Sequence, residues 1–174
     1  MSKPRSLQWE IDRIPNNRKV VQGGGLRAYS VDGMVPKAAV FPNTIEEISA
    51  LLLAASKEGK SVIPWGGGTA MSLGNRARYF DLVIGTSRLN RILEHEPADL
   101  TVVVQAGATL GKLQDVLREK NQFLPLDPPF SENSTIGGIL AANSSGPIRA
   151  QFGTARDRLI GIKVVHANGD VTKG

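Results

Sequence analysis

The chain has 174 residues, of which 41% are hydrophobic and 21% charged, and its formal net charge is +5. These values are ordinary for a globular domain, and the length suffices for one domain or two small lobes. The basic residues are scattered and only two Trp and two Tyr accompany them, a pattern that does not favour nucleic-acid binding. No apolar run approaches the ~20 residues that span a bilayer, so we expect no membrane span.

Residues 1–34 are predicted to be a polar lead-in without sustained periodicity. The run Gly23–Gly25 lacks a flanking strand–helix pattern and is interpreted as a linker. The basic residues of this part indicate a solvated arm or a contact with an acidic partner subunit; they are Lys3, Arg5, Arg13, Arg18 and Lys19. The first 30 residues show no apolar stretch typical of a secretory signal.

The next part of the chain has a β-α-β pattern, which predicts parallel strand pairing. Thr44 and Glu47 form a capping-box pair, and Gly59 suits the position after the end of a helix. The expected elements are a strand over 38–41, a helix from 44 to about 60, and strands over 61–64 and 81–84. The apolar residues at three- and four-residue spacing predict the inner face of the helix; they are Ile45, Ile48, Leu52 and Ala55.

The second half of the chain is expected to contain mostly antiparallel strands with helices. Thr109 is the predicted N-cap of a helix that continues to about Lys120. Asn168-Gly169 is a strong hairpin signal. The expected strands cover 92–96, 101–105 and 159–165, with a return strand that begins at 171. Because the chain ends at Gly174 inside that strand, we expect it to be truncated at the C-terminus.

An uncharged glycine loop follows the strand over 61–64. Residues 64–74 read Pro-Trp-Gly-Gly-Gly-Thr-Ala-Met-Ser-Leu-Gly. Glycine allows positive φ angles and a close approach to the backbone, and successive N–H groups in such a turn can form an anion-binding nest. The loop therefore indicates a diphosphate site, with a tight structural turn as the alternative.

A second stretch rich in small residues covers 125–146. Ser134 or Thr135 is the expected N-cap of a short helix over 136–143, whose first N–H groups would be free to bind phosphate. Gly137 and Gly138 would let a ligand lie directly on the backbone. The alternative is close packing of the helix against a neighbouring segment.

Other nucleotide-binding and catalytic motifs fit poorly. The glycine loop lacks the third glycine of a dinucleotide fingerprint, and Gly107 to Leu113 departs from a Walker A loop in its spacing and its last residue. His95 and His166 lie in or beside predicted strands, without a nucleophile elbow or metal-ligand spacing nearby. The absence of cysteine excludes thiolate metal sites and a sulfur-linked flavin within this chain. We therefore expect no metal and can assign no catalytic residue.

From about Val35 onward, the motifs together resemble the FAD-binding domain of the vanillyl-alcohol oxidase / p-cresol methylhydroxylase family. Within it the spacing is most similar to that of the FAD-binding subunit of bacterial glycolate oxidases and of related D-lactate dehydrogenases. The resemblance rests on Phe41–Thr44, Pro64–Leu73, Leu124–Pro129, Thr135–Gly138, Ala142–Asn143, Gly153, Asp157, Leu159–Gly161, Val164–Val165 and Asn168–Asp170.

The resemblance implies that FAD is the cofactor, and that it is bound noncovalently, because positions 68–72 contain no histidine. The implied cofactor-binding residues are Pro64, Trp65, Gly66, Gly67, Gly68, Thr69, Ala70, Ser72, Leu73, Asp127, Pro128, Ser134, Thr135, Ile136, Gly137, Gly138, Ala142, Asn143 and Ile162. Of these, Ser72, Ser134, Thr135 and Asn143 would add side-chain hydrogen bonds to phosphate or ribose. Asp157 is expected to be structural, accepting N–H groups from the loop at Gly153, with a cofactor contact as the alternative.

The expected fold is α+β with two lobes, a small parallel β-α-β lobe over about 35–90 and a mostly antiparallel lobe over about 91–174, with FAD between them. The implied function is FAD binding in an oxidoreductase that acts on a 2-hydroxy acid such as glycolate or D-lactate. The alternatives are a nonenzymatic flavin-binding assembly subunit and a nucleotide-binding module without flavin. The resemblance also implies partner subunits and a cytoplasmic location, peripheral to the inner membrane through those partners.

Overall fold

The computed structural model describes residues 11–12 and 20–174, so the five basic residues assigned to the arm (Lys3, Arg5, Arg13, Arg18 and Lys19) lie outside the described part. The chain forms two compact units. The first consists of Met1–Trp65, Met71–Gly85 and Gly161–Gly174, and the second of Gly66–Ala70 and Thr86–Ile160. Two segments thus group differently from the expected lobes: the glycine loop belongs to the second unit and the C-terminal residues to the first.

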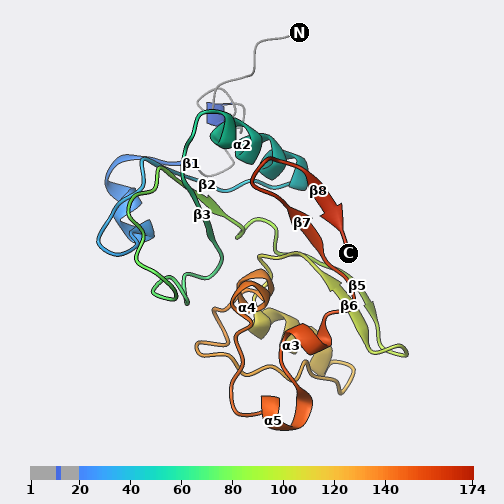
Figure 1. The fold of residues 1–174 in the computed structure, drawn as a ribbon. Coiled ribbons are helices and arrows are strands. Elements are labelled where there is room, and N and C mark those ends of the chain that lie inside the picture. The colour runs from blue at the N-terminus through green and yellow to red at the C-terminus, as the bar shows by residue number, and fades with distance from the viewer. Residues whose placement is uncertain (1–10, 13–19) are drawn as a thin grey trace. The chain divides into compact units, whose positions relative to one another are not determined.

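The first unit contains a four-stranded sheet in the order β1-β2-β4-β3 (Figure 1). Its strands are β1 (Val20–Val21), β2 (Ala38–Val40), β3 (Val62–Trp65) and β4 (Leu82–Gly85). β2 and β3 both pair with β4 in parallel, while β1 is antiparallel to β2. The parallel pairing predicted from the β-α-β order is confirmed.

Helix α2 (Ile45–Lys57) connects β2 to β3 and begins at the predicted cap. The Thr44 hydroxyl accepts a hydrogen bond from the Glu47 N–H at 3.2 Å, and the Glu47 carboxylate accepts one from the Asn43 N–H at 2.8 Å. The helix ends before Gly59, which has a φ of +61°. In a capping box the Glu47 carboxylate would accept from the N–H of the N-cap, Thr44. Here it accepts from the N–H of Asn43, the residue before the N-cap.

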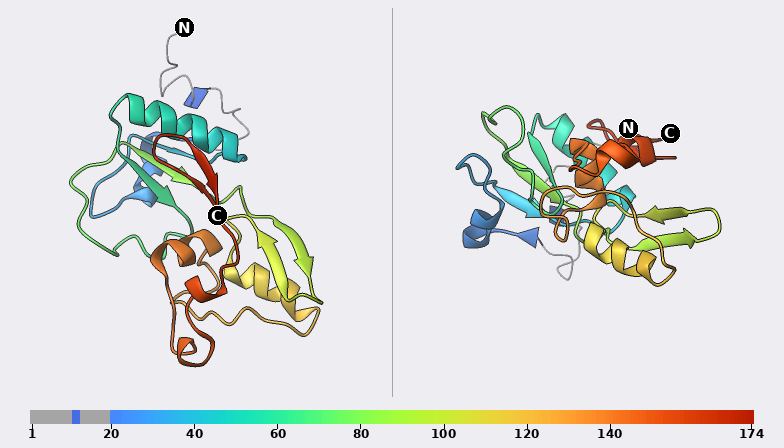
Figure 2. Two further views of the ribbon diagram at one scale, coloured as in Figure 1. Left: turned by 45° about the vertical axis from the view of Figure 1, so that its right-hand side comes forward. Right: turned by 90° about the horizontal axis from the view of Figure 1, so that it is seen from below.

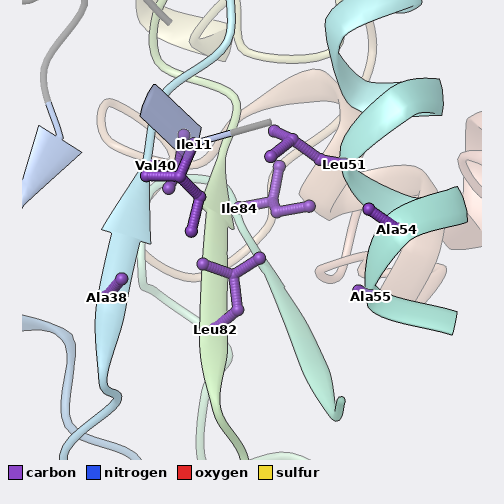
Figure 3. Packing of buried hydrophobic residues seen from close by; sticks show 8 residues of the cluster. All are labelled: Ile11, Ala38, Val40, Leu51, Ala54, Ala55, Leu82 and Ile84. Carbon is purple, nitrogen blue, oxygen red and sulfur yellow. The ribbon is translucent and has the colours of Figure 1, made fainter. Parts of the chain in front are cut away.

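One face of the sheet packs against α2 through residues that Figure 3 shows together. Leu51, Ala54 and Ala55 are the buried residues of α2, whereas Ile48 and Leu52 are only partly buried. Ala55 lies in this core and Ile48 and Leu52 pack against it, as predicted, whereas Leu51 and Ala54 were not predicted. Three consecutive leucines over 51–53 fit more than one apolar stripe, and packing on β4 selects Leu51.

The other face of the sheet packs against a 3₁₀ helix, η1 (Gly23–Tyr29). The prediction of a linker at Gly23–Gly25 was wrong, because Leu26 buries its side chain in this second core and holds the segment in place.

A β-hairpin attaches the C-terminal residues to the first unit. β7 (Lys163–Val165) and β8 (Val171–Lys173) are antiparallel, and Gly169 in the turn has a φ of +88°. The Ser49 hydroxyl of α2 donates a hydrogen bond to the Gly169 carbonyl. The predicted hairpin is confirmed, and this contact explains why residues 161–174 belong with α2.

The second unit combines an antiparallel hairpin with short helices. Its elements are β5 (Ile92–Glu96), β6 (Thr101–Val104), α3 (Leu110–Arg118), α4 (Ile136–Ala142), α5 (Arg149–Phe152) and a 3₁₀ helix, η2 (Arg156–Arg158). Both views of Figure 2 show α3 beside the β5–β6 hairpin. The core of this unit contains Leu110, Leu126, Ile139 and Ala155. The mixture of strands and helices in the two units confirms the α+β class.

Candidate functional site

The glycine loop after β3 presents a row of backbone donors without acceptors. Within the part of the chain that the structure describes, the N–H groups of Gly66 to Ala70 donate no hydrogen bond. Gly68 has a φ of +74°, a conformation that favours glycine. Backbone N–H groups without an acceptor in the protein are available to bind water or a ligand. The loop therefore has the chemistry of an anion site.

A hollow of about 420 Å³ adjoins this loop within the second unit. It is lined by Gly67, Gly68, Thr69, Phe130 and Asn133. The volume lies within the range of roughly 300–1,000 Å³ that is usual for small-molecule sites. None of the five lining residues carries a charge, so backbone dipoles would supply the attraction for a phosphate.

The two glycine-rich stretches pack directly against each other. A Cβ on Gly67 would lie 1.9 Å from the carbonyl oxygen of Asn133, and one on Gly66 would lie 2.3 Å from the Thr135 hydroxyl oxygen. These distances exclude any side chain at either position. Both glycines are therefore required by the packing of the loop, whatever ligand it binds.

Hydroxyl groups join the loop to the second stretch. The Ser134 hydroxyl donates to the carbonyl of Pro129 at 3.0 Å, and it lies 3.1 Å from the hydroxyl of Thr69. Because Ser134 has a single hydroxyl proton, Thr69 must be the donor in the second bond. Ser134 and Thr135 are each only 4% exposed. These hydroxyls fix the site rather than stand free in it.

The N-terminus of α4 does not have the free donors that the sequence predicted. The N–H groups of Ile136 and Gly137 each donate at 2.8 Å, to the carbonyls of Ala108 and Ala106 respectively. The N–H group of Gly138 donates to the Thr135 hydroxyl at 3.3 Å. The expectation that these first N–H groups are free was therefore wrong.

The reason is a long-range pairing that brings residues 106–109 beside the start of α4. Thr109 and Thr135 form an isolated antiparallel bridge. A Cβ on Gly137 would lie 2.8 Å from the Cβ of Ala106. Gly137 thus serves close packing, the alternative that the sequence had left open.

Asp127 and Asn143 also hold the chain rather than stand free. The Asp127 carboxylate accepts hydrogen bonds from the N–H groups of Gly146 and Ile148 at 2.9 and 3.1 Å. Asn143 ends α4 in a left-handed conformation, and its side-chain oxygen accepts from the Arg156 N–H at 3.3 Å. Both residues fix the segment between α4 and α5.

One buried hydroxyl in that segment lacks a partner. The Oγ atom of Ser145 makes no hydrogen bond within the described residues. Buried polar groups are nearly always paired, so this atom is a candidate donor to a ligand. Sequence reasoning missed Ser145, as it missed Phe130 and Asn133, because nothing local distinguishes these residues from ordinary turn residues.

The other predicted site residues are distributed over both units. Pro128 is buried and Ala142 half-buried in the second unit. The indole of Trp65 packs edge-on against Tyr29, with ring centroids 5.3 Å apart, in the first unit. The predicted site residues that also belong to the first unit are Pro64, Ser72, Leu73 and Ile162.

Asp157 has the structural role that we predicted. Its carboxylate accepts hydrogen bonds from the backbone N–H and the hydroxyl of Thr154 at 2.7 and 2.8 Å. These bonds lower the pKa of Asp157 below its ordinary value. They fix the turn after Gly153, where a Cβ would lie 3.0 Å from the carboxylate.

The two histidines are bound to neighbouring side chains. The Nε2 atom of His95 lies 2.9 Å from the side-chain oxygen of Gln122, and that of His166 lies 2.8 Å from the Thr172 hydroxyl. The described residues contain no group of three or more His, Cys, Asp or Glu side chains that could hold a metal ion.

Comparison with known proteins assigns the chain to a protein family. A family model described as an FAD binding domain matches residues 36–174. The chain belongs to this family. FAD is accordingly its cofactor, and the expected resemblance is confirmed.

The curated relatives are longer proteins. The chain is 34% identical over 154 residues to the glycolate oxidase subunit GlcD of Bacillus subtilis, which covers 86% of this chain and 33% of that protein. It is 34% identical over 139 residues to a mitochondrial D-lactate dehydrogenase [cytochrome] of Arabidopsis thaliana, covering 80% of this chain and 24% of the relative. The chain therefore spans about a third of the length of the first relative and about a quarter of the second.

Solved structures show the same fold at lower identity. A p-cresol methylhydroxylase with bound substrate matches 96% of this chain and 34% of its own, with a TM-score of 0.78 and 21% identity. An alkyldihydroxyacetonephosphate synthase matches 99% of this chain and 35% of its own, with a TM-score of 0.80 and 24% identity. In the described residues, no helix is long and apolar enough to cross a membrane.

The site fits the phosphate part of FAD. The unpaired N–H groups of Gly66 to Ala70 could bind a diphosphate, and the hollow beside them has room for more than a phosphate group.

Proposed function

We propose that this chain supplies the FAD-binding domain of an oxidoreductase that acts on a 2-hydroxy acid such as glycolate or D-lactate. The observation that carries the binding part is the row of unpaired N–H groups from Gly66 to Ala70 beside the hollow. The substrate class is supported by the relatives, which include a glycolate oxidase subunit, a D-lactate dehydrogenase and a D-2-hydroxyglutarate dehydrogenase.

In this proposal the loop from Gly66 to Ala70 holds the diphosphate by its backbone. Thr69, Ser134 and Pro129 form a hydrogen-bonded chain that keeps the loop in shape. Asp127 and Asn143 would act indirectly, because their hydrogen bonds fix the segment that contains Ser145. When bound, the flavin accepts the electrons of the oxidised substrate, and the protein supplies position and electrostatics.

We further propose that FAD is bound without a covalent link. The chain has no cysteine, and residues 68–72 contain no histidine. The uncharged lining of the hollow supports noncovalent binding of FAD through backbone hydrogen bonds and shape complementarity.

The second candidate is a flavin-binding assembly subunit whose partner chain carries catalysis. It is favoured by one observation: the hollow beside the loop is lined by two glycines, a threonine, a phenylalanine and an asparagine, none of which can act as an acid or base at neutral pH. The groups that move the substrate proton would then come from a partner or from further sequence. Partner subunits like those of a glycolate oxidase, and a cytoplasmic location at the inner membrane through them, remain part of this proposal.

The proposal is tested by loading the purified chain with FAD, removing the excess and recording the flavin absorbance before and after substrate. We expect a bound flavin band. Bleaching by glycolate, D-lactate or D-2-hydroxyglutarate under anaerobic conditions would support the oxidoreductase. A stable band that none of the three acids bleaches would favour the assembly subunit, and no bound flavin at all would contradict both.

A further inference from the structure

Phe130 combines an exposed ring with an unusual backbone conformation. Its side chain is 71% exposed and its φ is +55°. Bulky residues rarely adopt a positive φ. The carbonyl of Phe130 accepts hydrogen bonds from the N–H groups of Asn133 and Ser134, both at 3.0 Å, so the turn holds the residue in this conformation.

Phe130 lies at the hollow that adjoins the glycine loop. Phe130 lines this hollow together with Gly67, Gly68, Thr69 and Asn133. The site therefore combines the unpaired N–H groups of the loop with an exposed aromatic residue at the same hollow. Small-molecule sites commonly combine apolar or aromatic surface with a few placed polar groups.

The chemistry of this pair indicates a ligand that carries both a phosphate and a planar ring. Backbone N–H groups recognise the phosphate. An exposed aromatic ring gains stability by burial against another flat π-system, and any nucleobase or flavin has such a face. At about 420 Å³ the hollow lies in the size range of sites for whole small molecules.

We propose that Phe130 is a positioning residue whose ring packs against the planar heteroaromatic ring joined to the bound diphosphate. This inference rests on the proposed FAD site. It adds a side-chain contact to binding that otherwise depends on the backbone N–H groups of the loop. FAD carries two such rings, adenine and isoalloxazine, and the test uses a ligand for each.

Leu100 provides a matched control. It has the same φ of +55° and its side chain is 76% exposed, but it lies in the turn between β5 and β6 and does not line the hollow. Truncating Leu100 removes an exposed apolar side chain from a left-handed position without touching the site. Phe130→Gly is a second test variant that removes the ring and preserves the turn, because glycine adopts this φ without strain.

The experiment measures dissociation constants by calorimetry for FAD, ADP, FMN and inorganic pyrophosphate with the full chain and its variants. We expect Phe130→Ala and Phe130→Gly to weaken FAD, and either ADP or FMN, by about 5- to 150-fold, the range for loss of one stacked base. Phe130→Tyr and Leu100→Ala should bind like the wild type, and pyrophosphate affinity should not change.

Two results would overturn the inference. In the first, both Phe130 variants bind FAD as the wild type does. In the second, they lose pyrophosphate as strongly as FAD, which would mean that the residue only shapes the loop. Failure of the wild-type chain to bind FAD is a separate result that would refute the proposed FAD site itself and the inference with it. Thermal unfolding of each variant identifies loss of the fold.

Discussion

At the scale of single residues, the site depends on positions that exclude side chains for different reasons. Gly67 has no room for a Cβ because the backbone of Asn133 lies too close, and Gly137 has none because Ala106 lies too close. Gly68 instead has a φ of +74°. A substitution at Gly68 therefore changes the local conformation of the N–H row directly.

We predict that Gly68→Ala lowers FAD affinity by about 5- to 30-fold, because an alanine in the left-handed region costs about 1–2 kcal/mol and rotates the donors. Gly33→Ala is the control, since Gly33 has a φ of +82° and free space around it. Fluorescence titration with FAD measures both variants. The interpretation fails if Gly68→Ala and Gly33→Ala both bind like the wild type.

At the scale of secondary-structure elements, local signals in the sequence predicted where helices start, whereas contacts between distant segments were not predicted. Thr44, Thr109 and Thr135 were all expected at helix starts, and each accepts a hydrogen bond from the N–H three residues later. Threonine capping is a local effect and is visible in sequence. The hydrogen bond from Gly137 to Ala106 joins segments about 30 residues apart. No local pattern in the sequence predicts this contact.

The strand starts of the first unit are joined by one carboxylate. Asp81 lies before β4, accepts a hydrogen bond from Lys37 at 2.7 Å and another from the Ser61 N–H at 3.1 Å. The Lys37 bond, followed by the Ser61 bond, lowers the pKa of Asp81 below its ordinary value. These bonds connect the starts of three neighbouring strands.

We predict that Asp81→Asn lowers the free energy of unfolding by about 1 kcal/mol at pH 7. A depressed carboxylate pKa stabilises the fold above the unfolded pKa of about 3.9 and loses this contribution as pH falls through the folded pKa. The difference between wild type and variant should therefore shrink below about pH 4. Urea unfolding at pH 7 and pH 3 measures it, and a difference that grows toward pH 3 would contradict the assignment.

The start of α4 offers a second test at this scale. We predict that Gly137→Ala lowers the free energy of unfolding by about 1–3 kcal/mol, because the added methyl overlaps Ala106. Gly138→Ala is the control, since its Cβ would meet only the Thr135 hydroxyl oxygen at 3.1 Å. Urea unfolding at pH 7 is the measurement. Equal stability of the two variants would restore a ligand role for Gly137.

At the scale of the whole chain, the sequence predicted the family, the α+β class and the cofactor. It did so because the motifs lie in one order over residues 36–174. It did not predict which backbone donors are free, since that depends on how distant segments pair.

We predict that acid precipitation of the FAD-loaded chain releases all flavin into the supernatant, because residues 68–72 offer no histidine and the chain no cysteine for a covalent link. Absorbance of supernatant and pellet measures the release, and a flavoprotein with a known covalent link is the control. Flavin that stays in the pellet would contradict the noncovalent assignment.

The central claim is that the cofactor phosphates bind the N–H groups of the loop from Gly66 to Ala70, and not those at the start of α4. The most direct measurement is a ¹H–¹⁵N correlation spectrum of the labelled chain, recorded during titration with FAD. We expect the loop amide protons to shift downfield as they form hydrogen bonds. The amides of Ile136 and Gly137, which already donate to Ala108 and Ala106, should not show such a shift. Downfield shifts concentrated at Ile136 and Gly137, with an unchanged loop, would contradict it.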